Sequence, residues 1–157
     1  DGGPVALLEP LGLYDDNGIV GSGAGADWPL GRARIVREGR DATVIAYGAA
    51  VGRLESVLGR LAAQRGAGSP ELIDLVSLRP LDLETVLASV ARTGRLVAID
   101  SGPEPDPILS EVVAAVAERG FTCLMAPPVR LSLSGPAGME GAGEFESALL
   151  AVLERGR

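Results

Sequence analysis

The stretch that decides the fold is IDLVSLRPLD at residues 73–82, followed after one helix length by TGRLVAID at residues 93–100. The run at residues 71–78 is apolar enough for a strand, and Asp82 stands where the N-cap of a helix is expected. Residues 83–90 then carry apolar side chains at helical spacing, before the second quoted run forms another strand. The passage therefore predicts strand, helix and strand, which is the repeating unit of an α/β sheet.

The same alternation extends toward the N-terminus. Residues 32–37 alternate polar and apolar side chains, as a half-exposed strand does, whereas residues 42–47 form a continuous apolar run suited to a strand covered on both faces. A tight turn at residues 38–41 separates the two runs, so they are predicted to pair as an antiparallel hairpin. A helix follows Gly48, and its inward side chains fall at three- and four-residue steps: Val51, Leu54, Leu58 and Leu61.

The alternation also continues toward the C-terminus. Asp106 followed by Pro107 is typical of an N-cap and a first helical position, and the helix is expected to run to about Arg119. Residues 129–133 form the last apolar run, and a Gly-rich loop at 134–143 precedes a terminal helix striped by Phe145, Ala148, Leu149 and Val152. Right-handed crossovers make the later strands parallel, so the predicted fold is a three-layer α/β domain with one antiparallel strand.

The first thirty residues differ in character. Residues 4–9 form a short apolar run that predicts a strand, and residues 10–30 are rich in glycine and proline, which is typical of a linker or long loop. The compact unit is therefore expected to begin near Gly31.

Composition excludes several classes of function. A formal charge of −7 disfavours nucleic acids and anionic membranes, and no apolar run is long enough to span a bilayer. The chain has no His and no Lys, which excludes histidine-based catalysis and Schiff-base chemistry within it. The single cysteine, Cys123, cannot form an internal disulfide, so we expect a reducing, cytoplasmic setting and a buried thiol.

Several segments in order resemble one family. Residues 31–48 resemble the opening of the transketolase C-terminal domain, and the closest match is the beta subunit of thiamine-diphosphate-dependent 2-oxoacid (pyruvate and branched-chain) dehydrogenases. Residues 73–82, 88–90, 93–97 and 126–130 continue the resemblance at family-like spacing, and residues 4–10 with Leu13 and Tyr14 are similar to the end of the preceding pyrimidine-binding domain. The resemblance implies a mixed, mostly parallel five-stranded sheet flanked by helices.

The resemblance also implies a division of labour. Residues 1–30 would be the end of a pyrimidine-binding domain plus a linker, and residues 31–157 a transketolase C-terminal-like domain. Such a domain serves subunit assembly and partner docking. Thiamine diphosphate and magnesium are implied for the complete enzyme but not for this chain. The implied partners are a second copy in a homodimer, an alpha subunit and the acyltransferase core.

The sequence departs from the family pattern at four places. Val76 stands where arginine is common, and Asp100 where glutamate is common. The loop at 101–106 replaces a Gly-rich, aromatic-containing loop, and the proline-rich ending expected after Arg130 is missing. These changes point to an altered partner surface.

Six candidate residues are expected at the carboxyl edge of the sheet, where open α/β sheets place their ligand crevice. They form a candidate crevice or interface without an assigned catalytic, cofactor-binding or metal-ligating role: Gly48, Arg79, Asp82, Asp100, Glu104 and Asp106. Arg79 and Asp100 could form a functional pair; the alternatives are a purely structural salt bridge, or Asp82 capping its helix while Arg79 faces solvent. Glu104 and Asp106 make an acidic loop, which favours solvent or a partner over a metal because two carboxylates are an incomplete site.

Two other functions stay open. A stand-alone interaction or small-ligand-binding module derived from this fold is favoured by the unusual loop at 101–106. The equivalent domain of a transketolase or deoxyxylulose-phosphate synthase fits the turn at residues 79–82, although the sequence around Asp74 and Gly94 is closer to the dehydrogenases.

Overall fold

The computed structural model describes residues 3–15, 17, 28–63, 68–100, 106–132 and 142–154. Five strands and four α-helices lie in these ranges, with two short 3₁₀ turns, η1 and η2. In chain order they are η1 (Leu11–Leu13), β1 (Arg34–Arg37), β2 (Thr43–Ala46), α1 (Ala49–Ala63), β3 (Glu71–Asp74), α2 (Leu83–Thr93), β4 (Leu96–Asp100), α3 (Pro107–Arg119), η2 (Phe121–Cys123), β5 (Val129–Ser132) and α4 (Ala142–Glu154).

The strands form one mixed sheet in the order β1-β3-β2-β4-β5. β2, β3, β4 and β5 are parallel to one another, and β1 is the single antiparallel strand. The expected fold class, a three-layer α/β domain with a mixed five-stranded sheet, is therefore confirmed. β2 is buried along its whole length, as its continuous apolar run predicts.

The predicted hairpin between the first two strands is wrong. β1 pairs with β3, so that Arg34 faces Asp74 and Ile35 faces Ile73, while β2 lies on the other side of β3. The segment at residues 38–41 is therefore a crossing over the start of β3. Both sides of β2 are taken by the parallel strands β3 and β4, so β1 pairs with the outer side of β3.

Gly39 makes this crossing possible. A side-chain carbon at Gly39 would lie 2.3 Å from the amide nitrogen of Glu71 and 2.4 Å from the carbonyl oxygen of Ser69. The amides of Arg40 and Asp41 donate to that same Ser69 carbonyl, at 2.7 and 3.1 Å, and the Ser69 amide donates back to the Asp41 carboxylate at 2.5 Å. The crossing is thus held to the start of β3 at backbone distance, where only glycine fits.

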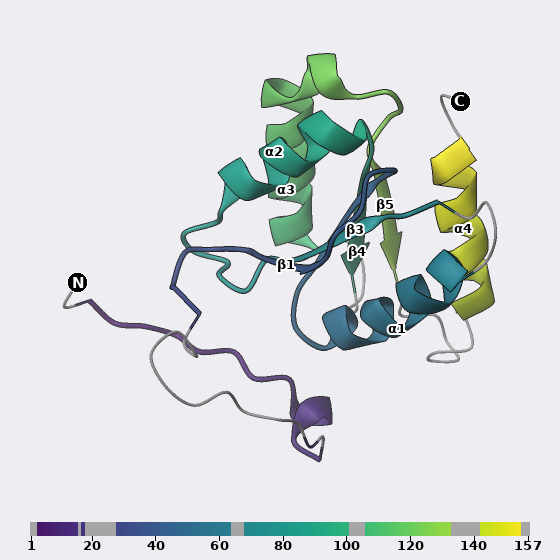
Figure 1. The fold of residues 1–157 in the computed structure, drawn as a ribbon. Coiled ribbons are helices and arrows are strands. Elements are labelled where there is room, and N and C mark those ends of the chain that lie inside the picture. The colour runs from purple at the N-terminus through teal and green to yellow at the C-terminus, as the bar shows by residue number, and fades with distance from the viewer. Residues whose placement is uncertain are drawn as a thin grey trace.

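Helices cover both faces of the sheet (Figure 1). α1 and α4 pack on one face over side chains such as Val44 and Leu72, and α2 and α3 pack on the other over Ile45 and Ile73. Because neighbouring residues of a strand point to opposite faces, the apolar runs of β2 and β3 fill both cores at once.

The helix boundaries follow capping rules. Asp82 and Asp106 accept hydrogen bonds from the amides of Thr85 and Leu109, so both predicted N-caps are confirmed. α2 ends at Gly94, which has the left-handed conformation (φ 68°) that favours glycine. The strand expected over 71–78 ends earlier, at Asp74, because Val76 turns the backbone to a positive φ of 52°.

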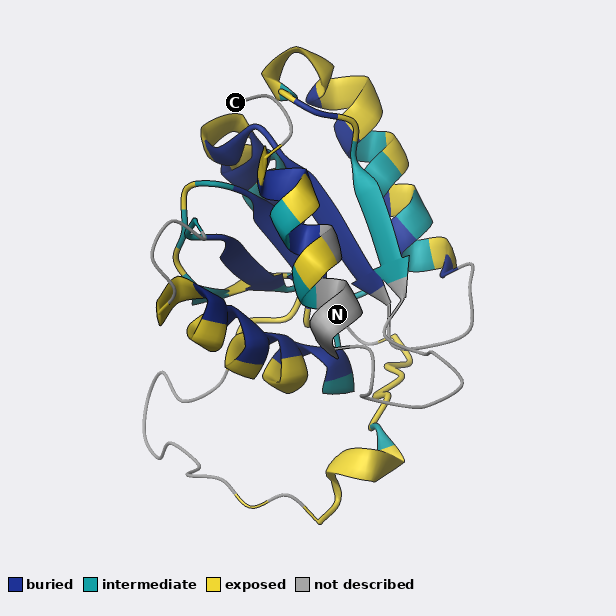
Figure 2. Ribbon diagram, turned by 90° about the vertical axis from the view of Figure 1, so that its right-hand side faces the viewer, coloured by how far each residue is buried: buried dark blue, intermediate teal, exposed yellow. Residues whose placement is uncertain are grey.

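The N-terminal arm, residues 3–15, lies apart from the sheet (Figure 1). The strand predicted over residues 4–9 does not form: in the described part of the chain this segment pairs with no strand. Its large apolar side chains are exposed (Figure 2). Expectations for the loops at 101–105 and 134–141 lie outside the described residues.

Among the helices in the described ranges, none combines the length and the apolar character that crossing a bilayer requires.

Candidate functional site

The six candidate residues were expected to meet at the carboxyl edge of the sheet. Gly48 follows β2, Arg79 follows β3, Asp100 ends β4, and Asp106 directly precedes α3. The backbone therefore brings the ends of three parallel strands to this edge. The side chain of Asp100 and the whole of Glu104 lie outside the described residues, so the expected Arg79–Asp100 pair stays a prediction.

Gly48 forms the turn from β2 into α1. Its φ of 61° lies in the left-handed region, which a side chain disfavours. A side-chain carbon there would stand 3.5 Å from Cγ of Pro10, so the N-terminal arm rests over this turn. The first turn of α1 carries no acidic residue.

Asp82 is buried and joins two distant segments. One carboxylate oxygen accepts from the Thr85 amide at 3.1 Å; the other accepts from the Thr85 hydroxyl at 2.7 Å and from the Ala33 amide at 3.1 Å. Burial raises the pKa of the Asp82 carboxyl, but these three hydrogen bonds and the Arg32 guanidinium at 3.7 Å outweigh burial and hold that pKa below its usual value. Asp82 therefore serves as an ionised cap that fastens the start of β1 to α2.

Asp106 has a similar arrangement at α3. Its carboxylate caps the Leu109 amide at 2.9 Å and accepts a second hydrogen bond from the phenol of Tyr47. Its carbonyl oxygen accepts from the Ser110 hydroxyl at 2.6 Å. The carboxylate is buried and occupied by donors of the same chain.

Arg79 faces solvent. Its side chain is 84% exposed, and its guanidinium lies 3.8 Å from the carboxylate of Glu111 on α3, which is a loose surface ion pair. Of the alternatives weighed for this turn, the geometry favours Asp82 as a helix cap with Arg79 exposed.

A second polar group lies at the opposite, amino edge of the sheet, and sequence reasoning missed it. Glu71, 1% exposed at the start of β3, accepts hydrogen bonds from Arg92 of α2 at 2.6 Å to both carboxylate oxygens. Thr43 lies 2.6 Å from the hydroxyl of Ser89 and 2.7 Å from that of Thr93, all three buried. The partners in each pair are 21 to 50 residues apart, so no local motif marks them.

An open depression of about 820 Å³ adjoins this group. Its lining includes Arg40, Asp41, Ser69, Glu71 and Arg92. Asp41 and Glu71 are already bonded to Ser69 and Arg92, so their polar atoms are committed to the fold.

The described residues do not fit thiamine diphosphate or its magnesium ion. Within those ranges, no three His, Cys, Asp or Glu side chains gather as a metal site would require. Among the described side chains at the carboxyl edge, the two buried carboxylates are Asp82 and Asp106, and both are occupied as helix caps. We therefore assign no step of thiamine chemistry to this part of the chain.

Cys123 is exposed, so the expectation of a buried thiol is wrong. It lies in the η2 turn after α3, where the chain leaves the core and where Phe121 and Met125 are also exposed. The apolar sequence around Cys123 therefore does not imply that its side chain is buried.

Comparison with known proteins agrees with this architecture. The family model described as "Transketolase, C-terminal domain" matches residues 31–152. The chain is 40% identical over 126 residues to the acetoin:2,6-dichlorophenolindophenol oxidoreductase subunit beta of Cupriavidus necator, covering 80% of this chain and 36% of that protein. It is 36% identical over 157 residues to the mitochondrial pyruvate dehydrogenase E1 component subunit beta-1 of Arabidopsis thaliana, covering 98% and 42%.

A third relative is the 3-methyl-2-oxobutanoate dehydrogenase subunit beta of Mycobacterium tuberculosis, 39% identical over 81% of this chain and 36% of that protein. A solved structure titled "Split gene transketolase, inactive beta4 tetramer" has the same fold, with a TM-score of 0.70 at 23% identity over 89% of this chain and 47% of that one. The chain spans less than half the length of each of these proteins. The match of the family model over residues 31–152 shows that the chain belongs to the transketolase C-terminal domain family.

Proposed function

We propose that this chain is the C-terminal region of the beta subunit of a thiamine-diphosphate-dependent 2-oxoacid dehydrogenase, and that it serves subunit assembly and partner docking rather than chemistry. The observation that carries the proposal is the similarity to such beta subunits over four fifths or more of the chain. Asp82 and Asp106 both accept hydrogen bonds from their own chain, so neither carboxylate is left for a substrate. This supports a role in assembly and docking rather than chemistry.

The N-terminal arm supports an assembly role. Four of its apolar side chains are 78–84% exposed: Val5, Leu7, Leu8 and Leu11. Such a run is unfavourable in water and is typical of a segment that packs against another surface. We propose that residues 1–30 are the end of a pyrimidine-binding domain plus a linker, and that the arm packs on the preceding part of the same polypeptide. The greater length of the relatives supports the preceding part of the polypeptide as the surface on which the arm packs.

The partners proposed for the complete protein are a second copy of the beta subunit, an alpha subunit and an acyltransferase core. Thiamine diphosphate and magnesium belong to that complete enzyme, in a cytoplasmic setting. The overall reaction would be oxidative decarboxylation of a 2-oxoacid, with transfer of the acyl group to a lipoyl arm.

Calorimetric titration of the 157-residue chain with thiamine diphosphate and magnesium tests the division of labour. We expect no heat of binding, because the described residues offer neither the ring carboxylate nor the metal ligands. Tight, magnesium-dependent binding to this chain alone would refute an assembly-only domain.

Arm docking is tested in the complete polypeptide with Leu7→Asp and Leu11→Asp together. Burying two charges in an apolar contact is costly, so we expect a lower thermal midpoint of the complete polypeptide in differential scanning calorimetry. Gly3→Asp with Gly12→Asp is the matched control, since it adds the same charge at arm positions with nothing within 4 Å. Equal thermal midpoints for the two variants would exclude the arm as a docking segment.

A further inference from the structure

The direction in which the chain adds strands to the sheet reverses at β2. The chain passes from β2 to β3 on one side, and then to β4 on the other side of β2. α1, which follows β2, packs in one core, and α3, which follows β4, packs in the core on the opposite face. In open α/β sheets, ligands bind between such diverging connections, at the carboxyl ends of the strands.

One side of this position is taken by a hydrogen bond between the two connections. Tyr47, directly after β2, donates its phenol proton to Asp106, directly before α3, although the residues are 59 apart in sequence. Asp106 is only 6% exposed, and its other carboxylate oxygen accepts from the Leu109 amide at 2.9 Å. The N-terminus of α3, which elsewhere offers amides to an anion, here holds the chain's own carboxylate.

The other side is taken by the arm. Pro10 lies over Gly48, with its Cγ 3.5 Å from where a side-chain carbon of that glycine would stand. Gly48 follows Tyr47 directly, so the arm rests on the same turn that carries the phenol.

We infer that the Tyr47–Asp106 hydrogen bond is a latch that closes the ligand position of this fold and joins α3 to the turn on which the arm rests. The latch has two consequences. The N-terminus of α3 does not offer its amides to an anionic ligand, and the first turn of α3 is stabilised by Tyr47, which directly follows β2. This inference concerns the domain itself and stands whether or not the proposed assembly role is correct.

Amide hydrogen exchange in the 157-residue chain tests the latch through a double-mutant cycle. Tyr47→Phe is expected to raise the exchange rate of the Leu109 amide about fivefold, the effect of losing one hydrogen bond. Asp106→Ser keeps a capping side chain but is too short to reach the phenol, so adding Tyr47→Phe to it should change the rate less than about twofold.

Tyr14→Phe is the matched control, since it removes a phenol that donates to Glu9 at 2.6 Å on the exposed arm. It should leave the Leu109 rate unchanged. The latch is refuted if Tyr47→Phe behaves like this control, or if the effects of Tyr47→Phe and Asp106→Ser simply add.

Closure of the ligand position is tested with inorganic phosphate as the probe. In NMR titrations of the unmodified chain we expect no shift of the amides at residues 49–51 or 108–109 beyond that of exposed arm amides. Saturable shifts at those amides would show the position to be open and would overturn the inference.

Discussion

At position 76 a β-branched side chain stands on a backbone that disfavours it. Val76 has a φ of 52° and is the one residue other than glycine with a positive φ in the described ranges. The left-handed conformation costs an L-residue about 1–2 kcal/mol, and branching at Cβ increases the conflict. Val76 is also 45% exposed, so little packing compensates for the strain. The turn after β3 is held by its neighbours, including a bond from the Val76 amide to Asp74 at 3.0 Å.

Val76→Asn should therefore stabilise the protein by about 1 kcal/mol, because asparagine tolerates the left-handed region. The measurement is the midpoint of urea unfolding at unchanged slope. Ile35→Asn is the control at a site of similar exposure (43%) with ordinary strand backbone, and it should not stabilise. Equal shifts for the two variants would argue against strain at Val76.

Asp82 gives a second prediction at this scale. Asp82→Ala removes a helix cap and leaves the Ala33 amide without its acceptor, so we expect a loss of about 2 kcal/mol at neutral pH. Asp15→Ala, on the exposed arm, should have no effect on the free energy of unfolding.

The pH dependence of this loss follows from the direction of the pKa. The folded pKa of Asp82 lies below its unfolded value, so its ionic contribution is fully present above the unfolded pKa, about 4. That contribution is lost as pH falls through the folded pKa. The difference in stability between the unmodified chain and Asp82→Ala should be constant above about pH 5 and shrink below about pH 4. A difference that grows on acidification would contradict this assignment.

At the scale of elements, the crossing from β1 to β2 has no room for the Cβ atom that any other residue would add at Gly39. Gly39→Ala places a carbon against the backbone of residues 69–71, which cannot move without moving β3. We expect a loss of more than about 2 kcal/mol, because overpacking against backbone forces β3 to shift.

Gly59→Ala is its matched control. Gly59 lies on the exposed side of α1 with nothing within 4 Å, so alanine should stabilise the helix by about 0.5–1 kcal/mol. Thermal unfolding of both variants measures the contrast. Similar behaviour of the two alanine variants would mean that the crossing tolerates a side chain.

The elements themselves could be predicted from sequence because their signals are local. Apolar spacing placed α1, α2 and α3, and Asp82 and Asp106 marked the starts of two helices. The order of the strands could not, because pairing β1 with β3 rather than β2 depends on contacts 40 residues apart. For the same reason the Tyr47–Asp106 and Glu71–Arg92 contacts were not foreseen.

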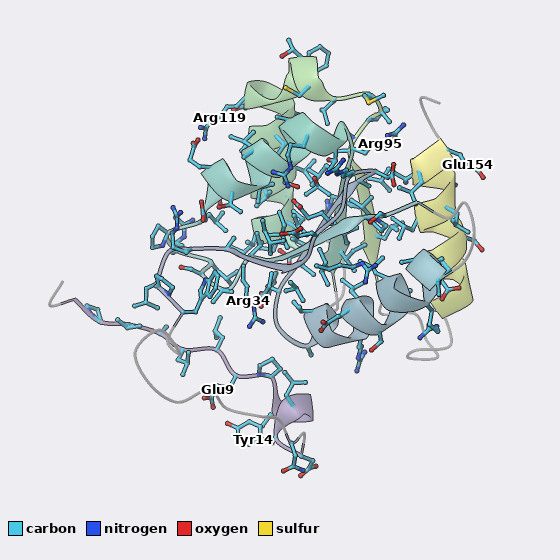
Figure 3. The ribbon with its side chains drawn as sticks, viewed as in Figure 1. Glu9, Tyr14, Arg34, Arg95, Arg119 and Glu154 are labelled. Carbon is cyan, nitrogen blue, oxygen red and sulfur yellow. The ribbon has the colours of Figure 1, made fainter. Side chains whose placement is uncertain are left out.

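At the scale of the whole molecule, exposed apolar side chains are concentrated at its N-terminal end. Most of the large ones belong to the arm or to residues 28–35, whereas Phe121 and Met125 lie at the distant η2 end. Figure 3 shows Glu9 and Tyr14 on the arm, apart from the sheet and its helices. The domain and the arm therefore behave as different kinds of structure: one buries its own core, and the other presents apolar groups outward.

Removing residues 1–15 should leave the thermal midpoint of the domain within about 4 °C of the full chain. The arm adds no buried side chain, and 1 kcal/mol corresponds to about 2–4 °C at this size. Differential scanning calorimetry measures the shift. A drop much larger than this would show that the arm is part of the domain's own core.

The crossing at Gly39 also sets an order of events during synthesis. β1 leaves the ribosome before its partner exists, since Arg34 must wait for Asp74, 40 residues later. At translation rates of about 5–20 residues per second, that delay lasts roughly 2–8 s. During that time β1 is an unpaired edge, and its terminal arginines, Arg34 and Arg37, oppose pairing with the same strand of another nascent chain through like charge. β1, the first strand of this sheet to be made, therefore stays unpaired until β3 has followed it out of the ribosome.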